Sequence, residues 1–281
     1  MLNYLRSGGG SVGNVILEAS DLKKEIDGKE ILQHVSFQIE EHASIAIRGS
    51  NGSGKSTLLK LLAGIYDPTS GKLVRNAKRI GYVPEHFPEN LRFKLKEYLT
   101  LVATFQGMSE TDIEAELSEY IRLFGIEPFT NTPLKKCSKG TKQKVGILQA
   151  LLIKPDILLL DEPLTGLDTS SQLNLMAMLE KLKTKMTIIF TTHEDLLVDN
   201  IADQIFYVKD GRVLVHTETK SPHLVIKVRF SNKSVLLRLQ LNEMHIEEDI
   251  AIITVSKDKS DDLLRKLLNN NCSVLDVRER I

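Results

Sequence analysis

The sequence contains little cysteine, no tryptophan and no long apolar run. Its two cysteines, Cys137 and Cys272, have no paired spacing, which excludes a disulfide framework and a zinc site. The longest purely apolar runs, such as ILLL at 157–160, are far shorter than the roughly 20 residues that a membrane helix needs. No secretory signal is visible. From these absences we expect a cytosolic protein.

The sequence also lacks a net charge, because 37 basic residues balance 37 acidic ones. Proteins that bind nucleic acid or an anionic membrane directly usually have a basic surface, so we expect no nucleic-acid partner. With 281 residues, 42% hydrophobic and 26% charged, the chain is typical of a globular protein with one large domain and a small one. The Gly/Ser run Ser7–Ser11 predicts a flexible segment over residues 1–14, similar to an engineered linker.

Strand-like and helix-like patterns alternate over residues 15–216, which predicts an α/β domain with a mostly parallel sheet covered on both faces. Within it, a polar and helical subdomain is expected over about residues 91–152. The expected elements are strands at 35–39, 44–49, 157–163 and 187–193, helices after residue 57 and at 171–182, and a hairpin at 204–215 turning at Asp210–Gly211.

The pattern breaks at 217–223, and a different one follows over residues 223–281. Alternating apolar residues predict strands at 224–230 and 235–241. Further strands are expected at 250–255 and 273–277, and between these two a helix with Leu263, Leu264, Leu267 and Leu268 on one face. This βββαβ order predicts a small α+β domain, in which we identify no functional motif.

The segment GSNGSGKST matches the phosphate-loop pattern G-x-x-x-x-G-K-[ST] and stands between an expected strand and an expected helix. Its glycines let the backbone wrap around phosphates, Lys55 can reach the β- and γ-phosphates, and the Ser56 hydroxyl can ligate Mg²⁺. A glycine-rich turn with a surface lysine is the structural alternative. The predicted nucleotide-binding residues are Gly49, Ser50, Asn51, Gly52, Ser53, Gly54, Lys55, Ser56 and Thr57.

Two later strands end in polar residues that suit the same chemistry. Asp161 follows an apolar strand, and the carboxyl ends of such strands are where ligands of α/β proteins bind. We therefore expect Asp161 to hold Mg²⁺ and the adjacent Glu162 to activate the attacking water. His193 ends the next strand, and its imidazole can hydrogen-bond a γ-phosphate at the same edge. The structural alternatives are a solvated acidic turn and a structural histidine.

The stretch KKCSKGTKQKV, Lys135 to Val145, allows two interpretations. Neighbouring lysines favour a thiolate and could make Cys137 a reactive nucleophile. Alternatively, Ser138 and Gly140 precede a helix, and a helix N-terminus with unpaired N–H groups can bind an anion. The residues alone leave both open.

The order of the phosphate loop, YVPEH, CSKGTKQK, ILLLDEP, LTGLD and TTH resembles the ATP-binding cassette (ABC) ATPases over about Val15 to Val215. The specific resemblance is to the nucleotide-binding subunits of bacterial export-type ABC transporters, since SKG replaces the usual SGG. It implies a P-loop NTPase core with a mostly parallel sheet, antiparallel N-terminal strands and a helical subdomain. ATP and Mg²⁺ are the implied cofactors.

The same resemblance implies the partners. Two such subunits enclose two ATP molecules head to tail, so Ser138, Lys139 and Gly140 would act on the ATP of a second ATPase subunit, and Asp168 would contact that subunit. In this position Cys137 would be a small packing residue and not a nucleophile. Integral-membrane transporter subunits would hold the protein on the inner face of the cell membrane.

Two residues depart from the family pattern. Glu85 stands where the family usually has a glutamine that ligates Mg²⁺ and senses the membrane subunits; a carboxylate can still bind a hard cation, but it adds negative charge beside the γ-phosphate. Ile26 aligns with an aromatic residue that stacks on adenine, so base selectivity should be weak.

We interpret the chain as an ATPase subunit that powers a membrane exporter. One alternative is a soluble ABC protein that acts on ribosomes or DNA, although the chain has one cassette and no heptad repeat. Another is an ATP-gated regulatory subunit with little hydrolysis, which Glu162 argues against.

Overall fold

A computed structural model describes residues 14–216, 223–230, 236, 244–247 and 249–279. The chain divides into two compact units, Met1–Thr217 and Glu218–Ile281. The expected flexible segment over residues 1–14 lies outside the described residues except for Asn14. Each unit is described separately below.

A six-stranded sheet forms the centre of the larger unit, with strand order β5-β6-β7-β3-β8-β9. All neighbouring strands are parallel except β8 and β9, which form the expected hairpin. Their bounds are Ile80–Val83 for β5, Ile157–Leu160 for β6, Thr187–Thr191 for β7, Ser44–Arg48 for β3, Gln204–Lys209 for β8 and Arg212–His216 for β9. Every residue of β6 and β7 is buried, as expected for parallel strands covered on both faces.

One face of this sheet packs against helix α1 (Lys55–Leu62) and a smaller antiparallel sheet of order β2-β1-β4. The smaller sheet contains β1 (Val15–Ile26), β2 (Lys29–Glu40) and β4 (Ser70–Arg75). The hydrophobic pattern did not single out β1, because β-bulges between Ala19 and Leu22 and between Leu22 and Lys24 interrupt its alternation.

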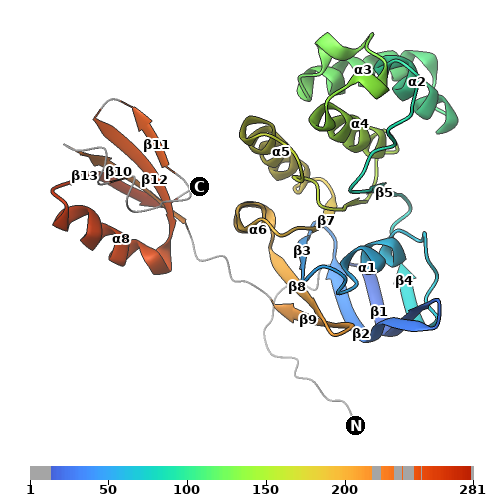
Figure 1. Ribbon diagram of the computed structural model, residues 1–281, viewed down its shortest axis with the longest axis horizontal. Helices are drawn as coiled ribbons and strands as arrows, with labels where there is room; N and C mark the ends of the chain where they lie inside the picture. The colour runs from blue at the N-terminus through green and yellow to red at the C-terminus, as the bar shows by residue number, and fades with distance from the viewer. Residues whose placement is uncertain (1–13, 217–222, 231–235, 237–243, 248, 280–281) are drawn as a thin grey trace. The chain divides into compact units, whose positions relative to one another are not determined.

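The opposite face packs against the helices that follow, and Figure 1 shows α2, α3 and α4 grouped at one end of this unit, away from β1, β2 and β4. The helices are α2 (Leu95–Phe105), α3 (Glu110–Leu123), α4 (Lys139–Leu151), α5 (Thr169–Leu182) and α6 (Asp195–Ile201). Short 3-10 turns at Glu127–Phe129 and Leu134–Lys136 precede α4. The fold class predicted from the sequence is confirmed: an α/β core with a mostly parallel sheet and antiparallel N-terminal strands.

In the described part of the smaller unit, helix α8 packs on an antiparallel sheet of order β11-β12-β10-β13. The bounds are His223–Arg229 for β10, Met244–Glu247 for β11, Ile250–Ser256 for β12, Lys257–Asn269 for α8 and Ser273–Glu279 for β13. Of the expected strand at 235–241, only Leu236 is described; it is buried and lies in a helix, so the strand prediction is wrong at this residue. The short strand β11 was not predicted.

Candidate functional site

Parallel pairing brings the carboxyl ends of β3, β5, β6 and β7 to one edge of the sheet. The phosphate-loop segment follows β3 directly, and Glu85 follows β5 after one proline. Asp161 and Glu162 follow β6, and His193 follows β7. Residues that are more than 140 positions apart in sequence, from Gly49 to His193, therefore lie at the same edge of the sheet.

Two glycines allow the loop to reach its conformation. A Cβ on Gly49 would clash with the Val208 carbonyl oxygen, and Gly54, at φ +106, occupies a left-handed conformation at the N-cap of α1. The Lys55 side chain is only 8% exposed, and its Nζ donates to the carbonyl oxygens of Gly49 at 2.9 Å and Ser50 at 3.3 Å. The loop therefore holds a buried ammonium group at its centre.

The predicted metal-binding residues Ser56 and Asp161 lie together. Asp161 is 4% exposed, and its Oδ1 accepts hydrogen bonds from Ser56 Oγ at 3.2 Å and Thr191 Oγ1 at 2.7 Å. Burial, together with the negative charge of Asp161, raises the pKa of Tyr82 to about 12. Hydroxyl and carboxylate oxygens are the ligands that Mg²⁺ prefers.

Glu162, His193 and Lys55 form a short chain of neighbouring polar groups. His193 Nε2 lies 3.2 Å from Lys55 Nζ and 3.3 Å from Glu162 Oε1. That carboxylate oxygen is buried and receives no hydrogen bond from the described residues. Burial raises the pKa of Glu162, although His193 and Lys55 act to lower it. A buried carboxylate with an open acceptor position can hold a water for activation.

A cavity of about 650 Å³ opens between these groups, within the size range of small-ligand sites. Ile26 is not among the described residues that line it, because it ends β1, where it pairs with Lys29; the wall contains Ile31 of β2 instead. Sequence reasoning missed Ile31 and Thr165, although Thr165 stands inside the motif LTGLD. The lining residues are Ile31, Asn51, Gly52, Gly54, Lys55, Ser56, Thr57, Glu85, Glu162, Thr165 and His193.

Glu85 is therefore part of the cavity wall, as its position after β5 suggested. Its Oε1 lies 3.8 Å from His86 Nδ1. Its negative charge is the smallest of the causes that raise the pKa of Glu162. In the described part of the chain, no group of three or more histidine, cysteine, aspartate or glutamate residues could hold a metal ion. Proteins usually hold Mg²⁺ through one or two carboxylates together with substrate phosphates.

Ser138, Lys139 and Gly140 begin α4 and are not among the described residues that line this cavity. Ser138 is the N-cap, and its Oγ accepts a hydrogen bond from Thr141 N–H at 3.1 Å. Lys139 packs against Gly166, because a Cβ atom added to Gly166 would lie 2.7 Å from Lys139 Nζ. Burial raises the pKa of the neighbouring Cys137 thiol, which argues against a reactive thiolate.

Asp168 has a local structural role that its motif did not reveal. It is the N-cap of α5, and its carboxylate accepts hydrogen bonds from Ser171 N–H and Ser171 Oγ, both at 2.9 Å. The hydrogen bond from the Ser171 backbone lowers the pKa of Asp168. The side chain is thus held in one orientation at the end of the LTGLD loop.

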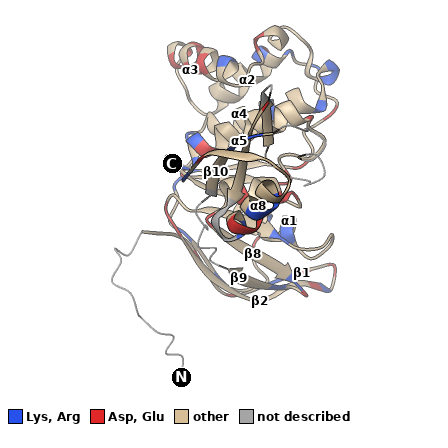
Figure 2. Ribbon diagram, turned by 90° about the vertical axis from the view of Figure 1, so that its left-hand side faces the viewer, with Lys and Arg blue, Asp and Glu red and all other residues tan. Residues whose placement is uncertain are grey.

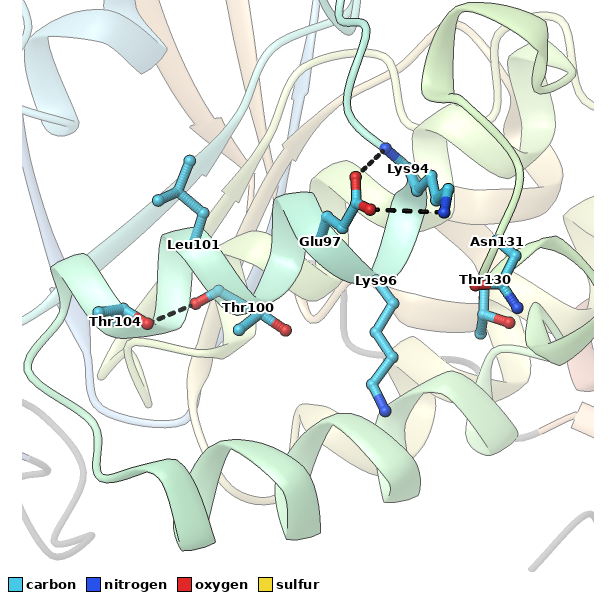
Figure 3. Close-up of a pocket in the computed structure, with 8 residues that line it drawn as sticks. All are labelled: Lys94, Lys96, Glu97, Thr100, Leu101, Thr104, Thr130 and Asn131. Carbon is cyan, nitrogen blue, oxygen red and sulfur yellow. Dashed lines mark hydrogen bonds and ion pairs between the residues drawn. The ribbon is translucent and has the colours of Figure 1, made fainter.

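A second hollow lies in the helical part of the larger unit, between α2 and the loop before α4 (Figure 3). Its charged groups are already paired: Glu97 accepts a hydrogen bond from Lys94 N–H at 3.0 Å, and Lys96 Nζ donates to Glu114 at 3.0 Å. None of the predicted site residues lines it. We therefore take the cavity at the sheet edge as the functional site.

Figure 2 shows basic and acidic residues mixed along the ribbon of both units, in line with the zero net charge. Among the residues that the structure describes, no helix is both long enough and apolar enough to cross a bilayer.

Comparison with known proteins shows the family of the chain. Residues 32–165 match the family model of the ABC transporter. The uncharacterised ABC transporter ATP-binding protein YxlF of Bacillus subtilis is 32% identical over 204 residues, which cover 70% of this chain and 69% of that protein. The zinc import ATP-binding protein ZnuC of Mannheimia succiniciproducens is 34% identical over 184 residues, 64% of this chain and 67% of that protein.

A solved structure agrees with the sequence comparison. The ATP-binding cassette MJ0796, in a dimeric post-hydrolysis state bound to ADP and Pi, superimposes with a TM-score of 0.66 at 25% identity, covering 72% of this chain and 98% of that one. Phosphate-loop residues, the expected Mg²⁺ ligands Ser56 and Glu85, and the expected base Glu162 line one cavity here. The chain belongs to the ATP-binding proteins of the ABC transporter family, and it is an ATPase that uses ATP and Mg²⁺.

Proposed function

We propose that this ATPase is the energy-supplying subunit of a membrane exporter and that two subunits close head to tail around two ATP molecules. The observation that carries the proposal is that the phosphate loop and the segment Ser138–Gly140, which the family resemblance assigns to the same ATP site, do not line one cavity on this chain. Phosphate-loop residues, Glu85 and Glu162 line the cavity, whereas Ser138, Lys139 and Gly140 are not among the described residues that line it. A second subunit would supply these residues to complete the site.

The chain's own residues fit ATP and Mg²⁺. Lys55 now hydrogen-bonds two carbonyl oxygens, and phosphate oxygens would replace these as stronger, charged acceptors. Ser56, Asp161 and Glu85 would hold Mg²⁺, which neutralises phosphate charge when bound. Phosphoryl transfer depends mainly on positioning and charge stabilisation, so the pre-arranged hydroxyl and carboxylate groups matter most.

Glu162 is the proposed general base. Its raised pKa and its buried oxygen without a hydrogen bond from the described residues suit a group that takes a proton from water. His193 bridges Glu162 and Lys55 within 3.3 Å, so its imidazole can orient the base and hydrogen-bond the γ-phosphate. These roles make Lys55, Glu162 and His193 the proposed catalytic residues.

Direction of transport is part of the proposal. The SKG sequence at Ser138–Gly140 resembles export-type cassettes, although a zinc import protein is also among the relatives. The proposed contact with the membrane subunits includes Glu85 and the exposed side of α2, where Leu101 is 38% and Phe105 80% exposed.

The proposal is tested by ATP turnover of the purified chain, with Lys55→Ala as the matched inactive control. Turnover that depends on Lys55 and Mg²⁺ is expected; its absence, with or without membrane subunits, would favour the ATP-gated regulatory alternative. Export is tested in inside-out vesicles containing the membrane subunits, where ATP should drive substrate into the vesicle lumen. Co-sedimentation with ribosomes instead of membranes would favour the soluble alternative.

A further inference from the structure

Strand β7 has a buried threonine at each end, and the two hydroxyl groups have different partners. Thr187 and Thr191 are both fully buried. At the amino end, Thr187 Oγ1 accepts a hydrogen bond from His42 N–H at 2.9 Å. At the carboxyl end, Thr191 Oγ1 donates to Asp161 Oδ1 at 2.7 Å and accepts from Glu162 N–H at 2.8 Å. Only the second threonine is bound to the acidic pair.

The Thr191 hydroxyl supports an unusual backbone conformation. Glu162 has a φ of +46, in the left-handed region that a non-glycine residue adopts when surrounding contacts hold it there. The hydrogen bond from Glu162 N–H to Thr191 Oγ1 is such a contact. It fixes the direction in which the Glu162 side chain leaves the end of β6.

The same hydroxyl also fixes the metal-binding carboxylate. Asp161 Oδ1 accepts from both Thr191 and Ser56, so its carboxylate is held from two elements, β7 and α1. Threonine is stiff at χ1 because it is branched at Cβ, which makes its hydroxyl a fixed point between two neighbouring acidic residues. The hydroxyl's one proton is given to Asp161, so it has none to donate to a nucleotide.

We propose that Thr191 is a positioning residue for ATP hydrolysis, whose hydroxyl sets the place of the general base Glu162 relative to the Mg²⁺ ligand Asp161. The inference rests on the proposed function, because it takes Glu162 as the base. A reacting group misplaced by about 1 Å can cost about 100-fold in rate. The effect of Thr191 should therefore appear in kcat more than in ATP binding.

The experiment compares Thr191→Val, which keeps the shape but removes the hydroxyl, with Thr191→Ser, which keeps the hydroxyl. Thr187→Val is the matched control, because it removes an equally buried and hydrogen-bonded hydroxyl from the other end of the same strand. Each full-length variant is measured for kcat and KM of ATP hydrolysis, for thermal unfolding, and for Mn²⁺ affinity in the presence of ATP by electron paramagnetic resonance.

We expect Thr191→Val to lower kcat about 10- to 100-fold with the KM for ATP within about threefold of wild type, and to weaken Mn²⁺ binding. Thr191→Ser should stay within about threefold of wild type in kcat. Thr187→Val should lower the unfolding temperature as much as Thr191→Val while keeping wild-type kcat and Mn²⁺ affinity.

Wild-type kcat or unchanged Mn²⁺ affinity in Thr191→Val would overturn the proposal. An equal loss of kcat in Thr187→Val, or no rescue by Thr191→Ser, would show a merely structural role and overturn it too. A wild-type protein that hydrolyses no ATP would overturn the proposed function and this inference together. Normal wild-type turnover with an unaffected Thr191→Val would overturn the inference alone.

Discussion

At the scale of single residues, the site holds opposite charges close together without fully pairing them. The Lys55 ammonium is bonded to backbone carbonyl groups, and Glu162 Oε1 is buried without a hydrogen bond from the described residues. Burying the Glu162 oxygen without a hydrogen bond costs free energy. A bound nucleotide and cation would supply the missing partners, so stability and ligand binding should be linked.

Glu162 should make both activity and stability depend on pH, in opposite directions. Burial raises its pKa above the ordinary 4.5. A base acts when ionised, so kcat should fall as pH drops through this raised pKa, at a higher pH than for an exposed glutamate. Because the folded state binds the proton more tightly, the Glu162 contribution to stability is present below pH 4.5 and is lost as pH rises through the folded pKa.

A pH–rate profile and unfolding temperatures of the nucleotide-free protein would measure the two trends. Glu162→Gln is the control, since it removes the titrating group. If the fall of stability with rising pH persisted in Glu162→Gln, another group would be responsible.

Glu85→Gln should raise turnover severalfold. Glu85 lines the cavity and its charge helps to raise the pKa of Glu162, so its neutralisation removes repulsion against both the base and the γ-phosphate. Steady-state kinetics over a Mg²⁺ titration would measure the change, with the exposed Glu89→Gln as control. Identical kinetics in Glu85→Gln and wild type would mean that this departure from the family pattern is neutral.

At the scale of elements, the site depends on the ends of strands and helices. Asp161 and His193 are placed by the ends of β6 and β7, Lys55 by the start of α1, and Ser138 and Asp168 by the starts of α4 and α5. Buried strands and capped helix ends are rigid supports, because their backbone groups are paired. A residue at such an end can therefore serve the element and the site together.

Variants of Asp168 can separate its role as the N-cap of α5 from its proposed role in contacting a second subunit. Asp168→Asn keeps an effective N-cap residue on α5 but removes the charge, whereas Asp168→Ala removes both. We expect Ala, but not Asn, to lower the unfolding temperature, by about 2–4 °C. If Asp168 also contacts a second subunit, both variants should weaken ATP-dependent dimerisation, measured by analytical ultracentrifugation. A normal dimer in Asp168→Asn would leave only the capping role.

At the scale of the whole molecule, the proposed function divides each ATP site between two chains, with the phosphate loop on one and Ser138–Gly140 on the other. Ser138–Gly140 are not among the described residues that line the cavity of the phosphate loop. In a two-subunit arrangement, Ser138–Gly140 of one subunit would complete the cavity of the other. The similar cassette MJ0796 has a dimeric structure. Oligomeric state should therefore follow the nucleotide state.

Glu162→Gln should convert the protein from a monomer into a stable dimer when ATP is added, because the phosphate contacts remain while water activation is lost. Hydrolysis should fall by at least about 100-fold. Size-exclusion chromatography with light scattering would follow the change, with ADP as the control. Adding Ser138→Arg to Glu162→Gln should abolish the dimer, and adding Cys137→Ala should not. A monomer in Glu162→Gln with ATP would contradict the head-to-tail arrangement.

Much of this protein could be predicted from the order of its residues. The phosphate loop, the strand-end Asp161 and Glu162, and the alternation of strands and helices are local patterns, and they led to the confirmed fold class and to ATPase activity. The alternation also predicted a common edge for Asp161 and His193, because parallel strands end together. Patterns failed where bulges broke the period, as in β1.

Tertiary structure alone decided which distant groups touch. The hydrogen bonds of Thr191 with Asp161 and Glu162, the place of Ile31 in the cavity wall, and the burial that raises the pKa of Glu162 depend on side chains from several strands. A sequence motif specifies residue types along one segment. Hydrogen bonding, desolvation and charge interactions act through space, so their outcome is set only when the strands and helices have packed.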